Sequence, residues 1–174
     1  MSIIRFETLP VKIGDWVILR LPENASAKLP SRGMTLVEGT VNGTRSKIVL
    51  EPDGEGSHWF KVDSKLRKAA KINTNSKVKL EVEPSKDWPE PEVPSDLKMA
   101  LVADRQANAL WMDITPMARW DWLRWVRSTK NPETRKRRIE VTLSKLKADN
   151  RRPCCFNRNQ CTDPELSKNG ILIK

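Results

Sequence analysis

Four of the eleven residues from Pro84 to Pro94 are proline. Proline has no backbone N–H and a fixed φ, so neither a regular helix nor a central strand runs through such a segment. The apolar pattern also changes there, from alternation before the segment to helical spacing after it. The sequence therefore predicts a first domain at 1–83, a proline-rich linker at 84–94, a helical domain at 95–150 and an irregular, cysteine-containing tail at 151–174.

Short strands separated by turn residues are expected throughout the first domain. Asn42-Gly43 is its strongest hairpin signal, because both residues tolerate the positive φ of a type I′ turn. A short helix is predicted from residue 63 or 64 to about 71, where small and apolar residues recur at helical spacing. The expected strands are 3–9, 15–21, 34–41, 45–50, 57–62 and 77–83.

These elements, about six strands and one helix, constrain the shape of the first domain. A flat sheet would leave long edges unpaired, and closing the sheet into a barrel removes those edges. We therefore expect a small closed antiparallel β-barrel whose interior is filled by its own side chains. With the helical domain that follows, the chain belongs to the α+β class.

Helix-start signals recur after the linker. Thr115-Pro116 and Asn131-Pro132 each place a capping side chain just before a proline at the first helical position, where the missing N–H is harmless. The predicted helices are 95–103, 105–112, 115–128 and 131–147. The last two should pack on each other through apolar stripes, formed by Ala118, Trp122, Trp125 and Val126 on one helix and by Ile139, Thr142, Leu143 and Leu146 on the other.

Composition excludes several kinds of protein. No apolar run approaches the roughly 20 residues of a membrane span, and Glu7 interrupts the stretch where a signal peptide would be apolar. Three cysteines, an odd number, in a chain without an export signal favour reduced thiols. We therefore expect a cytoplasmic protein without a membrane span. His58, the single histidine, excludes a multi-histidine metal site and is expected to be a buried, hydrogen-bonded side chain.

Positive charge is the strongest compositional signal, with 32 Lys and Arg against 22 Asp and Glu and a net charge of +10. Residues 94–174 carry 17 basic and 9 acidic residues, whereas residues 1–93 carry 15 and 13. Gathered on one exposed face, the cations of the helical part would bind an anionic partner in a salt-dependent way. The candidate binding residues are Arg127, Lys130, Arg135, Lys136, Arg138, Arg151, Arg152 and, as an exposed ring, Trp120.

The same side chains also have a purely structural interpretation. Arg137 could pair with Glu133 four residues earlier, and Arg135 and Arg138 could cover the tryptophan-rich helix. Large aromatic rings at helical spacing indicate a core, which applies to Trp122 and Trp125. The binding interpretation needs cations on a shared open face, and the structural one needs them held by neighbouring carboxylates.

Cys154, Cys155 and Cys161 lie close together in the tail. Three thiolates could hold zinc if a fourth ligand came from elsewhere, although no C-x-x-C pair is present. An adjacent pair of cysteines beside arginines could also sense redox state, because positive charge lowers the pKa of a thiol. The third interpretation is reduced thiols without a further role, and we expect no metal or other cofactor.

Ten short stretches along the chain match, in order and spacing, the pattern of one bacterial family. They are Trp16, Val37–Gly43, Leu50–Gly54, Leu66–Ala69, Val93-Pro94, Asp96-Leu97, Ala100-Leu101, Trp125-Val126, Glu133–Arg135 and Arg138-Ile139. Over nearly its whole length the chain resembles the bacteriocin-protection, YdeI/OmpD-associated proteins, whose front part is a domain of unknown function. The resemblance implies a small barrel followed by a helical region. It implies no reaction, and the family name points to a role in stress.

Together these observations predict a non-enzymatic cytoplasmic binding module that meets an anionic or protein partner through its basic C-terminal helices. One alternative is nucleic-acid binding through the Arg-rich helix at 131–147. A second alternative is a small enzyme that uses His58 or the cysteines.

Overall fold

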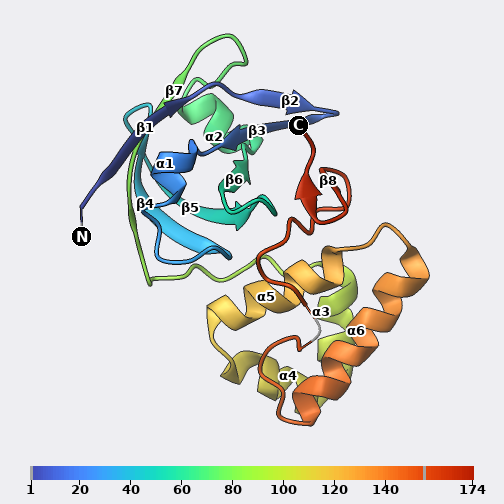
Figure 1. Ribbon diagram of the computed structural model, residues 1–174. Coiled ribbons are helices and arrows are strands. Elements are labelled where there is room, and N and C mark those ends of the chain that lie inside the picture. The colour runs from blue at the N-terminus through green and yellow to red at the C-terminus, as the bar shows by residue number, and fades with distance from the viewer. Residues whose placement is uncertain (1, 155) are drawn as a thin grey trace. The chain divides into compact units, whose positions relative to one another are not determined.

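The computed structural model describes residues 2–154 and 156–174 (Figure 1). The chain forms two compact units. The sheet unit comprises the residues up to Asp87 with Arg158–Cys161 and Lys168–Lys174, and the helical unit comprises Trp88–Asn157 and Thr162–Ser167. The predicted α+β class is confirmed.

A curled antiparallel sheet of seven strands forms the body of the sheet unit, in the order β1-β7-β4-β5-β6-β3-β2 (Figure 1). Two short helices accompany it, α1 (Glu23–Ser26) and α2 (Ser64–Ala69). The strands are β1 (Ile4–Thr8), β2 (Val11–Ile13), β3 (Trp16–Arg20), β4 (Thr35–Val41), β5 (Thr44–Pro52), β6 (His58–Lys61) and β7 (Val78–Pro84).

The prediction of a closed barrel is wrong. β1 and β2 stand at the two ends of the strand order, and no pairing joins them within the described residues. The reason lies at Pro10, which has no N–H to donate and separates the two strands. After Pro10 the chain forms β2, an additional strand of three residues, which pairs only with β3. The sheet is therefore curled but open, with one strand more than the expected six.

The interior of the sheet unit follows the predicted alternation. Val78, Leu80 and Val82 of β7 are buried in its apolar core. The predicted hairpin is confirmed, because Val41 pairs with Thr44 across Asn42 and Gly43, whose φ angles are 49° and 82°. Alternation and turn chemistry together fix which face of β4, β5 and β7 is buried.

Four helices form the helical unit: α3 (Ser95–Ala103), α4 (Arg105–Asp113), α5 (Pro116–Arg127) and α6 (Pro132–Lys147). Both predicted caps are present. Thr115 Oγ1 accepts from Ala118 N at 3.1 Å, and Asn131 Oδ1 accepts from Glu133 N at 2.9 Å. In the described part of the chain, every helix is too short or too polar to cross a membrane.

One apolar core holds the helices of this unit together. Its buried members come from all four helices and include Leu97, Leu101, Trp111, Ala118, Trp122, Leu123, Val126, Ile139 and Leu146. Of the predicted stripes, Trp125 and Leu143 are only partly buried and pack against this core. Thr142 is also fully buried and donates through Oγ1 to Arg138 O at 2.7 Å.

The last residues of the chain pack on the turn between β5 and β6. Leu172 is buried, and its N–H donates to Asp53 O at 2.9 Å. A Cβ atom at Gly54 would lie 2.0 Å from Gly170 O, so only glycine allows this close approach. Two short strands end the chain, β8 (Ser167–Lys168) and β9 (Ile171–Leu172), which pair with each other.

Candidate functional site

The run Arg135–Arg138 lies in the first half of α6. Consecutive residues on a helix point in directions about 100° apart, so four of them cannot share one face. Lys136 and Arg137 are exposed, whereas Arg135 and Arg138 are half-buried. The run therefore divides into an outward pair and an inward pair.

Arg135 binds the first turn of α3. Its Nε lies 2.7 Å from Asp96 Oδ2 and its Nη2 lies 3.1 Å from Asp96 Oδ1. The hydrogen bond from Arg135 lowers the pKa of the Asp96 carboxyl, and Asp96 in turn raises the pKa of Arg135. This two-point contact is the geometry in which arginine holds a carboxylate best, so Arg135 fastens α6 to α3.

Arg138 covers the tryptophan-rich helix, as the structural interpretation predicts. Its guanidinium carbon lies 5.5 Å from the centroid of the Trp125 ring. Its Nη1 donates to Trp125 O at 2.8 Å and also to the hydroxyl of Ser128. Burial lowers the pKa of Arg138. The side chain thus closes the C-terminal end of α5 against α6.

Arg151 and Arg152 each lie beside an aspartate. Arg151 Nη1 is 2.9 Å from Asp113 Oδ2, and its Nη2 donates to Asp113 O at 3.0 Å. Arg152 Nε lies 3.4 Å from Oδ2 of Asp121, whose side chain is only 3% exposed. Lys147, which the sequence does not single out, pairs with Asp104 at 2.7 Å. Lys147, Arg151 and Arg152 therefore serve contacts within the helical unit.

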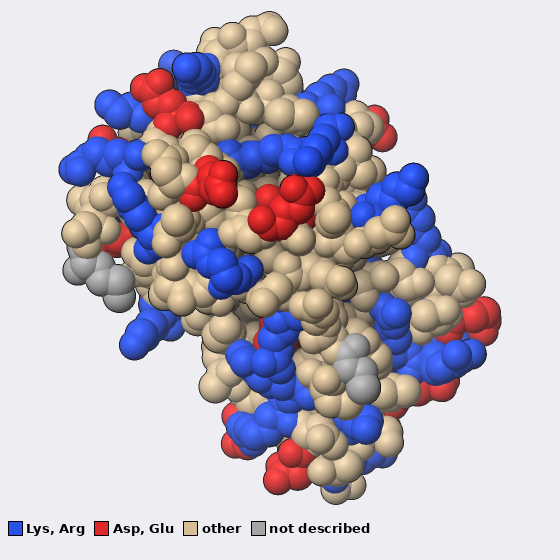
Figure 2. All heavy atoms as spheres, viewed as in Figure 1, with Lys and Arg blue, Asp and Glu red and all other residues tan. Residues whose placement is uncertain are grey.

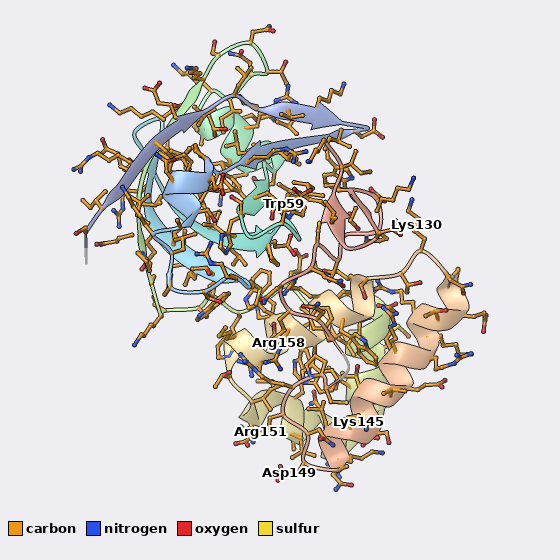
Figure 3. The ribbon with its side chains drawn as sticks, viewed as in Figure 1. Trp59, Lys130, Lys145, Asp149, Arg151 and Arg158 are labelled. Carbon is orange, nitrogen blue, oxygen red and sulfur yellow. The ribbon has the colours of Figure 1, made fainter. Side chains whose placement is uncertain are left out.

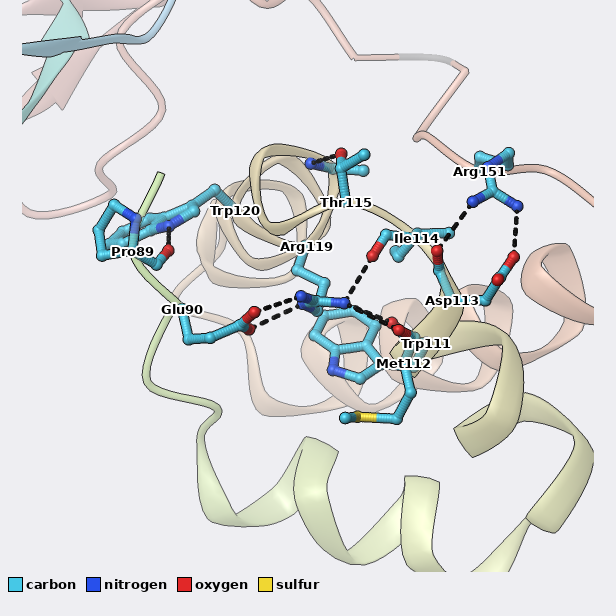
Figure 4. A network of polar contacts seen from close by, with 11 residues as sticks. Pro89, Glu90, Trp111, Met112, Asp113, Ile114, Thr115, Arg119, Trp120 and Arg151 are labelled. Atoms are coloured by element: carbon cyan, nitrogen blue, oxygen red, sulfur yellow. Dashed lines mark hydrogen bonds and ion pairs between the residues drawn. The ribbon is translucent and has the colours of Figure 1, made fainter. Parts of the chain in front are cut away.

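Trp120 is half-buried, and its ring holds the second half of the proline-rich segment. Its Nε1 donates to Pro89 O at 2.8 Å. The neighbouring Arg119 is only 5% exposed. It binds Glu90, the next residue of that segment, because its Nε donates to Glu90 Oε2 at 3.0 Å (Figure 4). Residues 88–94 are accordingly part of the helical unit.

Arg119 also binds the end of α4. Its Nη1 donates to Trp111 O at 3.0 Å and to Ile114 O at 2.6 Å, with a longer contact to Met112 O (Figure 4). The last carbonyls of a helix have no partner within the helix, and this buried guanidinium satisfies them. Sequence analysis missed Arg119, since its position among tryptophans gives no sign of burial.

Besides Arg151, which pairs with Asp113, three of the predicted cations are exposed: Arg127 at the end of α5, Lys130 in the α5–α6 turn and Lys136 on α6. Within the described residues none of the three has an ion-pair partner. Figure 3 shows the Lys130 side chain extending outward from the turn. We call these three residues the α5–α6 turn cluster. Of the eight predicted binding residues, they are the ones whose charge is open to a partner.

The positive charge is distributed differently over the folded units than along the sequence. The sheet unit carries 18 basic and 11 acidic residues, a net charge of +7, and the helical unit carries 14 and 11, a net charge of +3. Glu90 and Glu92 join the helical unit, whereas Arg158, Lys168 and Lys174 join the sheet unit. On the face shown in Figure 2, basic side chains are spread widely and acidic side chains are scattered among them.

His58 is buried in the sheet unit, between two hydrogen-bond partners. Nε2 lies 2.8 Å from Gly33 O, a pure acceptor, so this nitrogen carries the proton. Nδ1 therefore accepts from the Ser26 hydroxyl at 2.6 Å. Ser26 and His58 are 0% and 1% exposed. This pair joins α1, β6 and the segment before β4, and its burial keeps substrates away from it.

Stability between pH 7.5 and 5.5 should depend on His58. Burial lowers the pKa of its imidazole below the ordinary value of 6.5, and the nearby Arg32 lowers it further. Below about pH 6.5, His58 is therefore protonated in the unfolded chain while it stays neutral in the folded chain. The contribution of His58 to the free energy of unfolding is fully present above about pH 6.5. It falls as the pH drops below that value, by at most about 1.4 kcal/mol per pH unit.

Urea melts of the sheet unit's transition at several pH values measure this slope. The His58→Gln variant keeps an N–H donor for Gly33 O but cannot titrate, so its slope over the same interval should be flatter. Equal slopes for the two proteins would assign the pH dependence to other groups.

The cysteines are divided between the units. Cys154 is exposed in the helical unit and Cys161 is buried in the sheet unit. Cys155 lies outside the described residues. Among the residues that are described, no three His, Cys, Asp or Glu side chains gather closely enough to hold a metal ion.

Two family models match the chain. Residues 90–149 match the family described as bacteriocin-protection, YdeI or OmpD-associated, and residues 6–82 match a domain of unknown function, DUF1905. No curated protein matches the chain. The match at 6–82 covers the curled sheet except the first two residues of β1 and the last two of β7, and the match at 90–149 covers the four helices.

Proposed function

Because residues 6–82 match DUF1905 and residues 90–149 match the bacteriocin-protection, YdeI or OmpD-associated family, we propose that this chain is a non-enzymatic binding module. The helical unit meets an anionic or protein partner at the α5–α6 turn cluster. The family description itself names an association, with OmpD, and a protective role against bacteriocins. We extend to this chain only the general property of binding a partner, and we place its action in the cytoplasm.

One observation supports the location of the binding surface. Arg135, Arg151 and Arg152 lie against carboxylates, and Arg138 lies on Trp125. The turn cluster lacks such partners in the described structure and carries three charges on a short stretch of chain. Exposed charges of this kind steer a complementary partner and set its rate of association.

The burial of two reactive groups, His58 and Cys161, supports a non-enzymatic role. His58 is held by Ser26 and Gly33 in the interior of the sheet unit, and Cys161 is buried. A general base has to reach the proton that it removes, which a side chain 1% exposed does not do. Binding is therefore better supported than catalysis through these side chains.

The test measures binding of a fluorescently labelled polyglutamate peptide at about 50 and 200 mM salt. The cluster variant is Arg127→Gln, Lys130→Gln, Lys136→Gln, and the control variant is Lys98→Gln, Arg105→Gln, Lys145→Gln, which removes the same charge from the same unit. We expect the cluster variant to bind at least about fivefold more weakly than the control at low salt. Equal weakening of both variants, or no binding by the wild-type protein at about 50 mM salt, would refute the proposed surface.

A further inference from the structure

A second group of cations lies on the sheet unit. Residues 63–79 contain six basic residues and one acidic residue, Asp63. Asp63 is already engaged, because its Oδ1 accepts from Leu66 N at 2.7 Å and caps α2. All six cations are exposed. We call them the α2–β7 surface, which consists of Lys65, Arg67, Lys68, Lys71, Lys77 and Lys79.

These cations differ from Arg135 and Lys147 of α6, each of which lies against a carboxylate. In the part of the chain that the structure describes, none of the six forms an ion pair. Glu7 lies opposite Lys79 on β1, but the two side chains form no ion pair. Of the sheet unit's net charge of +7, residues 63–79 thus carry +5 on one short stretch of chain.

Hydrogen bonds hold the elements that carry these cations in one place. The tip of the β4–β5 hairpin joins both, because Asn42 Nδ2 donates to Ala70 O at 2.9 Å and Asn42 Oδ1 accepts from Lys79 N at 2.9 Å. Thr44 Oγ1 donates to Ala69 O at 3.2 Å. The end of α2 and the start of β7 are therefore fixed against each other. The backbone that carries the charges is therefore preorganised, and a ligand need not order it when it binds.

Lys71 occupies a backbone conformation that usually favours glycine. Its φ is +52°, and Ile72 N donates to Arg67 O at 3.0 Å, as in the turn that ends many helices. Glycine is the common residue there because a side chain at positive φ costs free energy. A lysine at this position adds a cation to the end of α2 despite that cost.

The composition of the surface indicates the ligand. The six side chains come from a helix, its C-terminal turn and a strand, so they reach different points of an extended anion. Lysines on such a surface contact successive phosphates without reading sequence. An anionic membrane would be met by apolar side chains among the cations, whereas the exposed large apolar residues of this unit lie outside 63–79.

We propose that the α2–β7 surface binds the phosphate backbone of nucleic acid, without sequence specificity. This surface is separate from the α5–α6 turn cluster, so either proposal can fail while the other stands. It also differs from nucleic-acid binding through the Arg-rich helix, where Arg135 and Arg138 are held by Asp96 and Trp125.

Fluorescence anisotropy with the full chain tests the proposal, using labelled single-stranded RNA, single-stranded DNA and duplex DNA, each about 20 nucleotides long so that it spans several phosphate contacts. The surface variant is Lys65→Gln, Arg67→Gln, Lys68→Gln, Lys77→Gln. The control variant is Lys12→Gln, Lys28→Gln, Lys86→Gln, Lys168→Gln, which removes four exposed cations of the same unit outside 63–79. Both variants have a net charge of +6, because each removes four of the ten excess positive charges.

We expect the wild-type protein to bind at about 50 mM salt and to lose most of its affinity by about 200 mM. The surface variant should bind at least about tenfold more weakly at the lower salt concentration. Its plot of log affinity against log salt should be flatter by about 0.7 to 0.9 for each phosphate that the variant no longer neutralises. The control should stay within about threefold of wild type, since it removes charge from the surroundings only.

Three outcomes would overturn the proposal. The first is no binding by the wild-type protein at the lower salt concentration. The second is equal weakening of the surface and control variants, which would show a general effect of charge. The third is stronger binding to vesicles of anionic phospholipid than to any of the nucleic acids. Comparison of the RNA and DNA arms identifies the preferred strand, and the cluster variant of the helical unit should bind nucleic acid as the wild type does.

Discussion

Replacing Trp122 with alanine is expected to lower the free energy of unfolding of the helical unit by about 3 to 5 kcal/mol. The Trp122 ring is 1% exposed and meets the Trp125 ring edge-on at 5.9 Å between centroids. Its Nε1 also donates to Arg151 O at 3.0 Å, which holds the segment after α6. The substitution therefore leaves a large cavity and an unpaired carbonyl.

Urea denaturation followed by the helical circular dichroism signal measures this loss. Trp120→Ala is the matched control on the same helix, because that ring is half-buried and makes a single hydrogen bond, to Pro89 O. It should cost roughly 1 to 2 kcal/mol. Equal losses for the two variants would contradict the assignment of Trp122 to the centre of the core.

Replacing Arg119 with alanine is expected to cost about 3 kcal/mol. The substitution removes the donors that satisfy Trp111 O and Ile114 O, two carbonyls in buried surroundings, and each buried acceptor left without a donor costs roughly 1 to 3 kcal/mol. It also releases Glu90, so residues 88–94 lose one of their attachments to the helical unit. Arg119→Lys should recover less than half of the loss, because one ammonium cannot reproduce the planar fork.

Arg151→Ala is the control for Arg119, since Arg151 also contacts an aspartate and a backbone carbonyl. The Arg151–Asp113 pair is 49% and 67% exposed, and exposed pairs contribute roughly 0 to 1 kcal/mol. The same urea melts compare the two variants. A loss for Arg151→Ala as large as that for Arg119→Ala would show that burial does not set the strength of these contacts.

Local signals in the sequence predicted much of the fold. Asn42-Gly43 marks a hairpin because few residue pairs tolerate two positive φ angles, and Thr115-Pro116 marks a helix start because capping is a local interaction. Barrel closure is a different kind of question. It depends on whether β1 and β2 pair with each other; Pro10 between them lacks an N–H to donate, but the residue alone does not tell which strands the chain on either side of it will pair with.

The candidate site was harder to predict, because a charge on a helix does not reveal its partner. Arg135 finds Asp96, which is 39 residues away, and nothing in the run Arg135–Arg138 points to that aspartate. The distribution of charge over the two units depends on the return of residues 158–161 and 168–174 to the sheet unit. Such long-range contacts explain a difference between sequence and structure. Along the sequence the excess of cations lies in residues 94–174, whereas in the structure the larger excess belongs to the sheet unit.

The route of the chain has a consequence for its synthesis. Residues 88–157 are made before residues 168–174, whose backbone completes the packing around Asp53 and Gly54. On the ribosome, the four-helix body is synthesised in full before the last strand, β9, is added. The sheet unit, whose strands β1–β7 precede the helical unit in the chain, is therefore the last to acquire all of its native contacts.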